Sequence, residues 1–186
     1  MGRSLPRPTT IIKGMHAMNT EGKTPEEVFF GGFNYKLSSF FHDDYTEIDS
    51  IETPATFMIV YEKKLAQKEF DLFDRLQFRI FYDKEIITGS NPINVKLLSD
   101  SYSAELVMNL AKMISDIFGL DDSGTCEKAD ISFYSADEYD LFWTIGDGES
   151  FISIEHDPKE GLTLNILFYN NLIGQSVGDL LMPEKA

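Results

Sequence analysis

The chain has 186 residues, of which 42% are hydrophobic and 13% aromatic, and its formal net charge is −15 at pH 7. This length fits one domain, and the apolar share is large enough to build a core, which excludes global disorder. The negative charge excludes nucleic acid and anionic membranes as partners, because both require a positive surface. The charge favours a basic protein, a cationic ligand or a metal ion as partner, with solubility alone as the alternative.

The N-terminal segment differs from the rest of the chain. Residues 1–20 carry three basic and no acidic side chains and lack the continuous apolar run of a secretory signal. We therefore expect residues 1–23 to be a flexible lead-in and residues 24–186 to form a single α+β domain. The only cysteine, Cys126, permits no internal disulfide, and no run of 18 apolar residues is present to span a membrane. These features favour a cytoplasmic location.

A short helix is predicted at the start of the domain. In the sequence TPEEVFF, Thr24 can cap a helix, Pro25 suits its first position, and Glu27 completes a capping box. The acidic stretch that follows, residues 34–56, has no clean period and reads as a solvated loop.

The middle of the chain mixes strand and helix signals. Residues 56–61 form a β-rich apolar run, which predicts a strand. The apolar spacing in residues 62–74 predicts a helix that gives way to a strand near Leu76, and the alternative is one long strand. The Gly-Ser-Asn-Pro turn within EIITGSNPINVKLL then predicts a hairpin.

The clearest helix is predicted over residues 102–118. Its apolar residues recur at helical spacing and end at Gly119, where a helix commonly terminates. They are Val107, Leu110, Ala111, Ile114, Ile117 and Phe118. One wide apolar stripe indicates a helix packed on a sheet, and we expect Val107, Leu110, Ile114 and Phe118 to be buried.

From residue 130 onward the apolar period changes to two. The runs ISFYS, YDLFWTI, FISIE and LTLNILFY predict four short strands of an antiparallel meander. The turns GDGE and HDPKEG are explained as hairpin corners, in which Gly161 supplies a positive φ. The predicted fold class is therefore α+β, with an antiparallel sheet that contains a C-terminal four-strand meander and packs against one or two helices.

Acidic and aromatic residues alternate in the segment 121–149, which holds nine acidic side chains against a single lysine. Aromatic rings beside carboxylates are typical of a surface that binds a basic protein. The alternative is that Phe142 and Trp143 lie in the core and the acids only solvate the outside. The predicted partner-binding residues are Asp137, Glu138, Tyr139, Asp140, Trp143, Asp147 and Glu149.

No motif for catalysis or for a cofactor is present in the sequence. The acidic loop around Cys126 disfavours a thiolate nucleophile, so we expect no catalytic residue and no cofactor. His42, Asp43, His156 and Asp157 are candidate metal ligands only if the fold brings them together.

These features favour a binding protein rather than an enzyme. The most concrete hypothesis is an immunity-type inhibitor of a basic toxin or effector, since the chain is small, acidic, aromatic-rich and poor in motifs. The alternative is a metal- or carboxylate-dependent hydrolase that uses the four His and Asp residues. The sequence does not distinguish a monomer from a homodimer.

Overall fold

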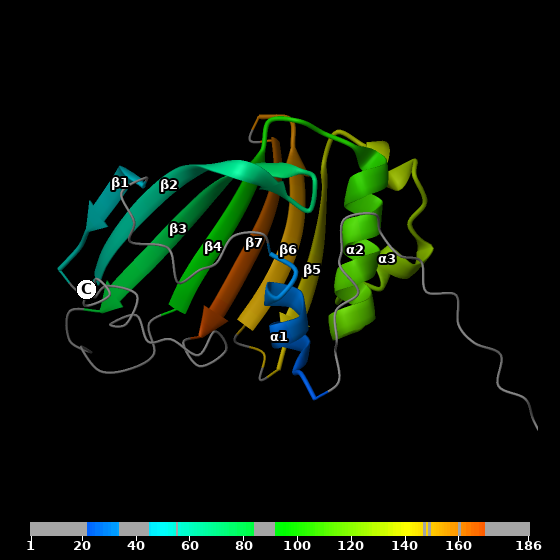
Figure 1. The fold of residues 1–186 in the computed structure, drawn as a ribbon, viewed down its shortest axis with the longest axis horizontal. Helices are drawn as coiled ribbons and strands as arrows, with labels where there is room; N and C mark the ends of the chain where they lie inside the picture. Colours follow the sequence, from blue (N-terminus) through cyan, green and yellow to red (C-terminus); the bar gives the residue numbers. More distant parts are fainter. Residues whose placement is uncertain are drawn as a thin grey trace, which may run out of the picture.

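A curved antiparallel sheet forms the body of the protein (Figure 1). The computed structural model describes residues 22–33, 45–54, 56–83, 92–146, 148, 150–159 and 161–169. Seven strands lie in the order β1-β2-β3-β4-β7-β6-β5. They are β1 (Thr46–Glu52), β2 (Thr56–Glu69), β3 (Phe73–Asp83), β4 (Pro92–Ser99), β5 (Tyr139–Ile145), β6 (Ser150–Asp157) and β7 (Gly161–Tyr169). All neighbouring strands are antiparallel, which confirms the predicted α+β class.

The C-terminal meander has three strands rather than the predicted four. The run ISFYS does not form a strand, because Phe133–Ser135 is a short 3-10 helix, η2. Asp130 accounts for this: its carboxylate accepts hydrogen bonds from the backbone amides of Ser132 and Phe133, which favours a local turn over a strand ladder. Strand β4 completes the central sheet instead, since it pairs with β7.

The turns of the meander are the predicted hairpin corners. Gly146 and Gly148, between β5 and β6, have φ angles of 63° and 88°. Gly161 opens β7 with a φ of 79°, and a Cβ atom there would lie 3.1 Å from the carbonyl oxygen of Ser99. Gly161 is therefore required by both its backbone conformation and its close neighbour.

The helix predicted over residues 62–74 is wrong, because β2 and β3 form one long hairpin across that stretch. An irregularity in the pairing between Lys64 and Glu69 interrupts the strand alternation, so the apolar residues fall at spacings that imitate a helix. The chain reverses at Phe70 and Asp71, with φ angles of 52° and 59°, and Leu72 N–H donates to the Glu69 carbonyl over 3.0 Å. Positive φ angles at both central residues define a type I′ turn, which here lacks its usual glycine. The alternative of a long strand was nearer the structure.

The acidic stretch after the first helix is not entirely a loop. Residues Thr46–Glu52 form β1, which pairs with β2 at one edge of the sheet. All seven of its residues are exposed to solvent. The strand was missed because neither of its faces is buried, so its sequence carries no apolar alternation.

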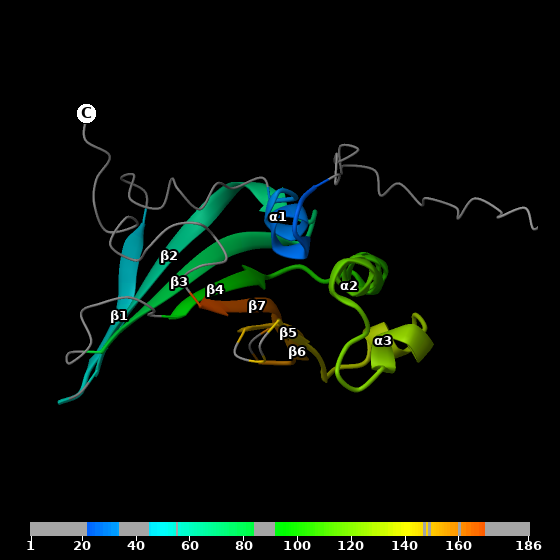
Figure 2. The same cartoon turned by 90° about the horizontal axis from the view of Figure 1, so that it is seen from below.

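The predicted long helix forms α2 (Ala104–Phe118), capped by the Ser103 side chain. Val107, Leu110 and Ile114 are buried as predicted, whereas Phe118 is only half-buried. The stripe packs with the residues of β5, β6 and β7 that face it, including Trp143, Ile152 and Leu164. We call the side of the sheet that contacts α2 the inner face and the opposite side the outer face (Figure 2).

The first helix, α1 (Pro25–Phe30), carries the predicted capping box between Thr24 and Glu27. It brings Phe29 into contact with the β2–β3 turn and with the end of α2. The Phe29 ring lies 6.0 Å from that of Phe70 and 5.6 Å from that of Phe118. This aromatic contact anchors the hairpin turn to both helices.

Among the helices that the structure describes, none is long and apolar enough to cross a membrane. The predicted lead-in, residues 1–23, lies almost entirely outside the described residues, as does the expected strand at residues 85–88.

Leu110 is 3% exposed at the centre of the α2 stripe. We expect Leu110→Ala to lower the free energy of unfolding by about 2–5 kcal/mol, because the lost side chain leaves a cavity between the helix and the sheet. Urea denaturation followed by circular dichroism measures this value. A change near zero would contradict the packing of α2 on the inner face.

Candidate partner-binding face

Strand alternation turns a group of carboxylates away from the core. Along β5, the inner-face residues are buried and the residues between them are exposed, because α2 covers only one side of the sheet. We give the name acidic face to the carboxylates and aromatic rings among the outward residues of β5 and β6, together with the residue before β5. They are Glu138, Asp140, Phe142, Phe151, Glu155 and Asp157.

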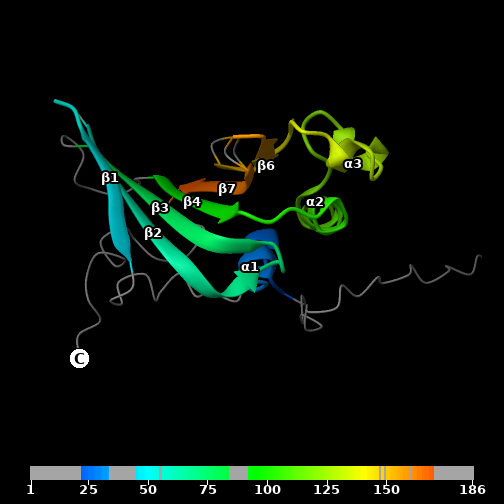
Figure 3. The ribbon, with the colours of Figure 1, turned by 90° about the horizontal axis from the view of Figure 1, so that it is seen from above.

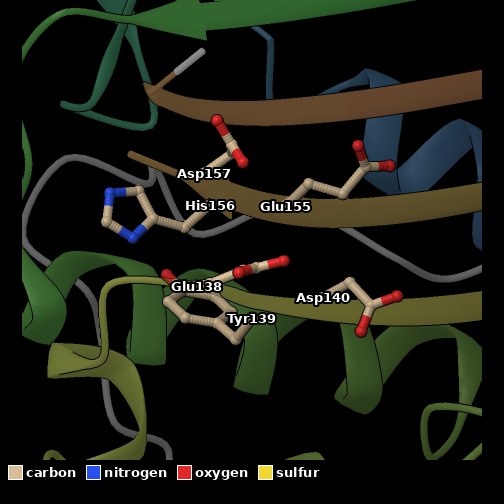
Figure 4. Close-up of a pocket in the computed structure, with 6 residues that line it drawn as sticks. All are labelled: Glu138, Tyr139, Asp140, Glu155, His156 and Asp157. Atoms are coloured by element: carbon tan, nitrogen blue, oxygen red, sulfur yellow. The ribbon is translucent and has the colours of Figure 1, made fainter. Parts of the chain in front are cut away.

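The carboxylates of the acidic face come from two adjacent strands (Figure 4). Asp140 of β5 lies directly opposite Glu155 of β6. Glu138 immediately precedes β5 and Asp157 ends β6, and all four line an open pocket of about 530 Å³. Within the described residues, no basic side chain forms an ion pair with Glu138, Asp140 or Glu155. The pocket is therefore a region of concentrated negative potential.

Glu155 is held in place by polar neighbours on the outer face. Its Oε1 atom accepts hydrogen bonds from Ser153 Oγ over 2.6 Å and from Asn165 Nδ2 over 2.8 Å. Asn165 Nδ2 also lies 3.3 Å from Ser153 Oγ. Because these bonds restrict its rotamers, Glu155 loses little side-chain entropy when a cation binds it.

Two phenylalanine rings lie beside the carboxylates. Phe142 of β5 and Phe151 of β6 stack with their centroids 4.9 Å apart and an interplanar angle of 27°. Phe142 is 40% exposed, which is high for a large apolar side chain in a strand. The pair offers an apolar surface that a partner can cover.

The structure separates the predicted partner-binding residues into two groups. Asp137, Glu138 and Asp140 are exposed. Tyr139 and Trp143 are only 8% and 1% exposed and belong to the inner-face core, and Tyr139 also lines the pocket, so their part in binding stays a prediction. Trp143 Nε1 donates to Ser115 Oγ of α2 over 3.2 Å.

Asp147 and Glu149 lie outside the described residues, so their part in binding stays a prediction. The sequence reasoning missed Phe151 and Glu155. The alternation of FISIE with YDLFW was the signal that could have found them, since opposed strands share their outward positions.

A cluster of tyrosines supports the acidic face from beneath. His156 stacks on Tyr102 at 4.3 Å, and the Tyr102 hydroxyl bonds to the Tyr139 hydroxyl and donates to the Tyr134 carbonyl. Burial raises the pKa values of Tyr134 and Tyr139 well above the ordinary value, with hydrogen bonds adding to the effect. These hydroxyls therefore stay neutral and act as hydrogen-bonding groups.

The candidate metal site cannot be assembled from the described residues. His42 and Asp43 lie outside them, so the four-residue site stays a prediction. The His156 ring packs against Tyr102, and its Nδ1 atom lies 3.2 Å from the Ala136 carbonyl oxygen. In the described part of the chain, no three His, Cys, Asp or Glu residues are grouped so as to hold a metal ion.

The free edge of β5 is closed by Asp122. Its backbone N–H donates to the Phe142 carbonyl over 2.8 Å. Its carboxylate accepts from Thr144 N over 3.2 Å and from Thr144 Oγ1 over 2.6 Å. The edge therefore has backbone partners next to the acidic face, which fixes the position of Phe142.

The neighbouring Asp121 holds the segment that follows α2. Its buried carboxylate accepts hydrogen bonds from Ser123 Oγ and from the backbone amides of Thr125 and Cys126, at the start of α3 (Thr125–Lys128). Burial acts to raise the pKa of Asp121, but these bonds outweigh it and hold the pKa below its ordinary value. Cys126 itself is buried, with its Sγ atom 3.7 Å from the Tyr134 hydroxyl.

Comparisons with known proteins give no relative. No protein-family model matches the chain, no curated protein shows significant similarity to it, and no solved structure matches its fold significantly.

We expect Asp121→Asn to lower the free energy of unfolding by about 1.5–3 kcal/mol at pH 7, because bonds to a charged acceptor are lost. The pKa of Asp121 is lower in the folded protein than in the unfolded chain, where it is ~3.9, so its charge stabilises the fold above that pH. This stabilisation is lost as the pH falls through the folded pKa. The difference from wild type should therefore shrink at pH 3. Urea denaturation at both pH values tests this, with the exposed Asp116→Asn as control. An equal difference at both pH values would show that the charge of Asp121 does not stabilise the fold.

Proposed function

We propose that the protein is an acidic protein-binding module whose acidic face holds a basic protein partner. The main support for this proposal is that four outward carboxylates line one pocket, beside the exposed ring of Phe142, which stacks on the half-buried Phe151. Carboxylates attract and orient a basic surface, and the rings supply apolar area to bury.

Arginine is the side chain that fits this combination best. Its planar guanidinium can bond a carboxylate through two parallel N–H donors and can also stack on an aromatic ring. Glu155, already held by Ser153 and Asn165, offers a preorganised acceptor, while Phe142 and Phe151 offer the ring surface.

The grouping of carboxylates on adjacent strands also lowers stability, and a binding function would explain why it is present. Like charges directly opposite on adjacent strands are destabilising, by roughly 0.2–1 kcal/mol for a pair such as Asp140 and Glu155. Natural proteins often keep such unfavourable groupings where binding requires them. Solubility alone would be served equally well by carboxylates spread over the surface.

The most concrete form of the proposal is an immunity-type inhibitor of a basic toxin or effector. Such an inhibitor has to recognise its target quickly and tightly, which electrostatic steering favours. The net charge of −15 and the concentrated potential at the acidic face support this form.

The charge of the face is tested with the double variant Glu138→Gln/Asp140→Asn. We expect a slower association with the basic partner and a flatter dependence of that rate on salt, because exposed charges act on the encounter. Stopped-flow kinetics at several salt concentrations measure both, once a partner has been isolated by cross-linking from the source cells. The melting temperature should stay close to that of the wild type.

The matched control is Glu105→Gln/Asp116→Asn, which removes the same charge from exposed positions on α2. It should leave the association rate nearly unchanged. If the acidic-face variant associates as fast as the wild type, and added salt slows neither, the proposed role of the face is refuted.

The aromatic part of the face is tested with Phe142→Ala. We expect dissociation to become at least tenfold faster, since the loss of a central aromatic contact commonly costs more than ~1.4 kcal/mol of binding energy. Leu120→Ala, at a site that is 56% exposed, is the control for loss of an exposed apolar side chain. Equal dissociation rates for the two variants would place the partner elsewhere.

A further inference from the structure

The two edge strands of the sheet differ in the hydrogen-bond partners of their backbone groups. At one end lies β5, where Asp122 donates to the Phe142 carbonyl and accepts from the backbone and side chain of Thr144. At the other end lies β1, which pairs with β2 and with no other strand of the described sheet (Figure 3). An edge strand presents backbone N–H and C=O groups that another strand can pair with.

Strand β1 is also exposed on both of its faces. All seven residues from Thr46 to Glu52 are exposed, and the apolar side chains of Ile48 and Ile51 are 48% and 49% exposed. The strand is nevertheless held in a defined position. Residues from Thr46 to Glu52 pair with β2, and Tyr45, just before β1, places its ring 6.0 Å from Phe78 on the inner face. The edge is therefore formed before any partner arrives.

The charges of β1 select what can pair with it. The strand carries Glu47, Asp49 and Glu52 and no basic residue. Asp49 pairs with Val60 on the outer face, and Glu47 pairs with Tyr61 on the inner face, so carboxylates point to both sides. Burial raises the pKa of Tyr61, and the charge of Glu47 raises it further, which places that charge close to the ring.

A second copy of this chain is a poor partner for β1. Pairing two β1 strands edge to edge would bring together two sets of three carboxylates, and like charges on neighbouring strands are destabilising. A strand that carries lysine or arginine at alternate positions would instead place all of them on one face of the new ladder, for example beside Glu47 and Glu52 on the inner face. The residues between them would then lie on the outer face, where apolar side chains could cover Ile51.

We propose that β1 is a strand-addition site, which binds an extended segment with alternating basic residues as an eighth strand of the sheet. Main-chain hydrogen bonds supply the affinity of such a complex, and side-chain pairs supply its specificity. The site lies at the opposite end of the sheet from the acidic face, so it does not depend on the function proposed above.

The probe is a synthetic eight-residue peptide of sequence KVKTKVKT, with blocked termini, titrated into uniformly ¹⁵N-labelled full-length protein. We expect the amide resonances of β1 and of the adjoining part of β2 to shift with a single binding curve. Shifts confined to the acidic face would overturn this proposal while supporting the proposed function. Shifts of β1 resonances with protein concentration alone would assign the edge to a second copy and would also overturn it.

Backbone pairing is tested separately from charge. A peptide of the same sequence with alternate residues N-methylated keeps its four positive charges but cannot form one side of the ladder. We expect it to bind at least tenfold more weakly at β1. Equal affinity of the two peptides would show that charge alone attracts them, and the strand-addition site would be rejected.

The matched variants are Glu47→Gln/Asp49→Asn on β1 and Glu138→Gln/Asp140→Asn on the acidic face. The first should weaken peptide binding at β1 at least fivefold, whereas the second should change it less than twofold. Both remove exposed charges, and unchanged resonances of the inner-face core verify that the fold is retained. The reverse pattern would contradict the proposal.

Discussion

The packing of α2 on one side of the sheet determines what the rest of the surface can be. Because side chains alternate along a strand, burying Leu141, Trp143 and Ile154 under the helix forces Asp140, Phe142 and Glu155 to the other side. The acidic face is thus a direct consequence of the core and needs no special loop to form it. A rigid sheet also holds binding groups more accurately than a flexible loop does.

A second contact fixes the position of the far half of the sheet relative to the helices. The β2–β3 turn places Phe70 at a backbone conformation that bulky residues rarely adopt, and the ring is held by Phe29 and by Phe33 at 5.2 Å. The contact compensates for the strain and explains why no glycine is needed there. It joins the element that begins the described fold to the hairpin that supports β1.

The elements predicted correctly from the sequence are those whose apolar pattern indicates one buried face. The alternation of YDLFWTI and the stripe of α2 are such patterns, and both led to the observed structure. The β2–β3 hairpin was misread because its irregular pairing and its glycine-free turn remove two signals on which strand prediction relies, namely apolar alternation and a turn glycine. Strand β1 was missed for a different reason, since a strand with two exposed faces has no period at all.

The candidate site was predicted only in part for the same reason. The acidic residues near Asp140 were identified from their density in the sequence, but density does not say which aromatic rings accompany them. Trp143, for which the sequence left both a surface and a core position open, lies in the core, whereas the half-buried Phe151, which stacks on the exposed Phe142, was overlooked. Only the pairing of β5 with β6, a long-range property, shows which rings and carboxylates share one side.

The burial of Cys126 provides a direct way to observe opening of the structure. It is the only thiol in the chain, and it is covered by Tyr134 and by the segment that Asp121 fastens. A thiol-reactive dye can therefore modify the protein only when that segment opens, so the modification rate reports the free energy of local opening beside the acidic face. The chain thereby carries a built-in reporter of local motion, at a position where no mutation is needed to introduce it.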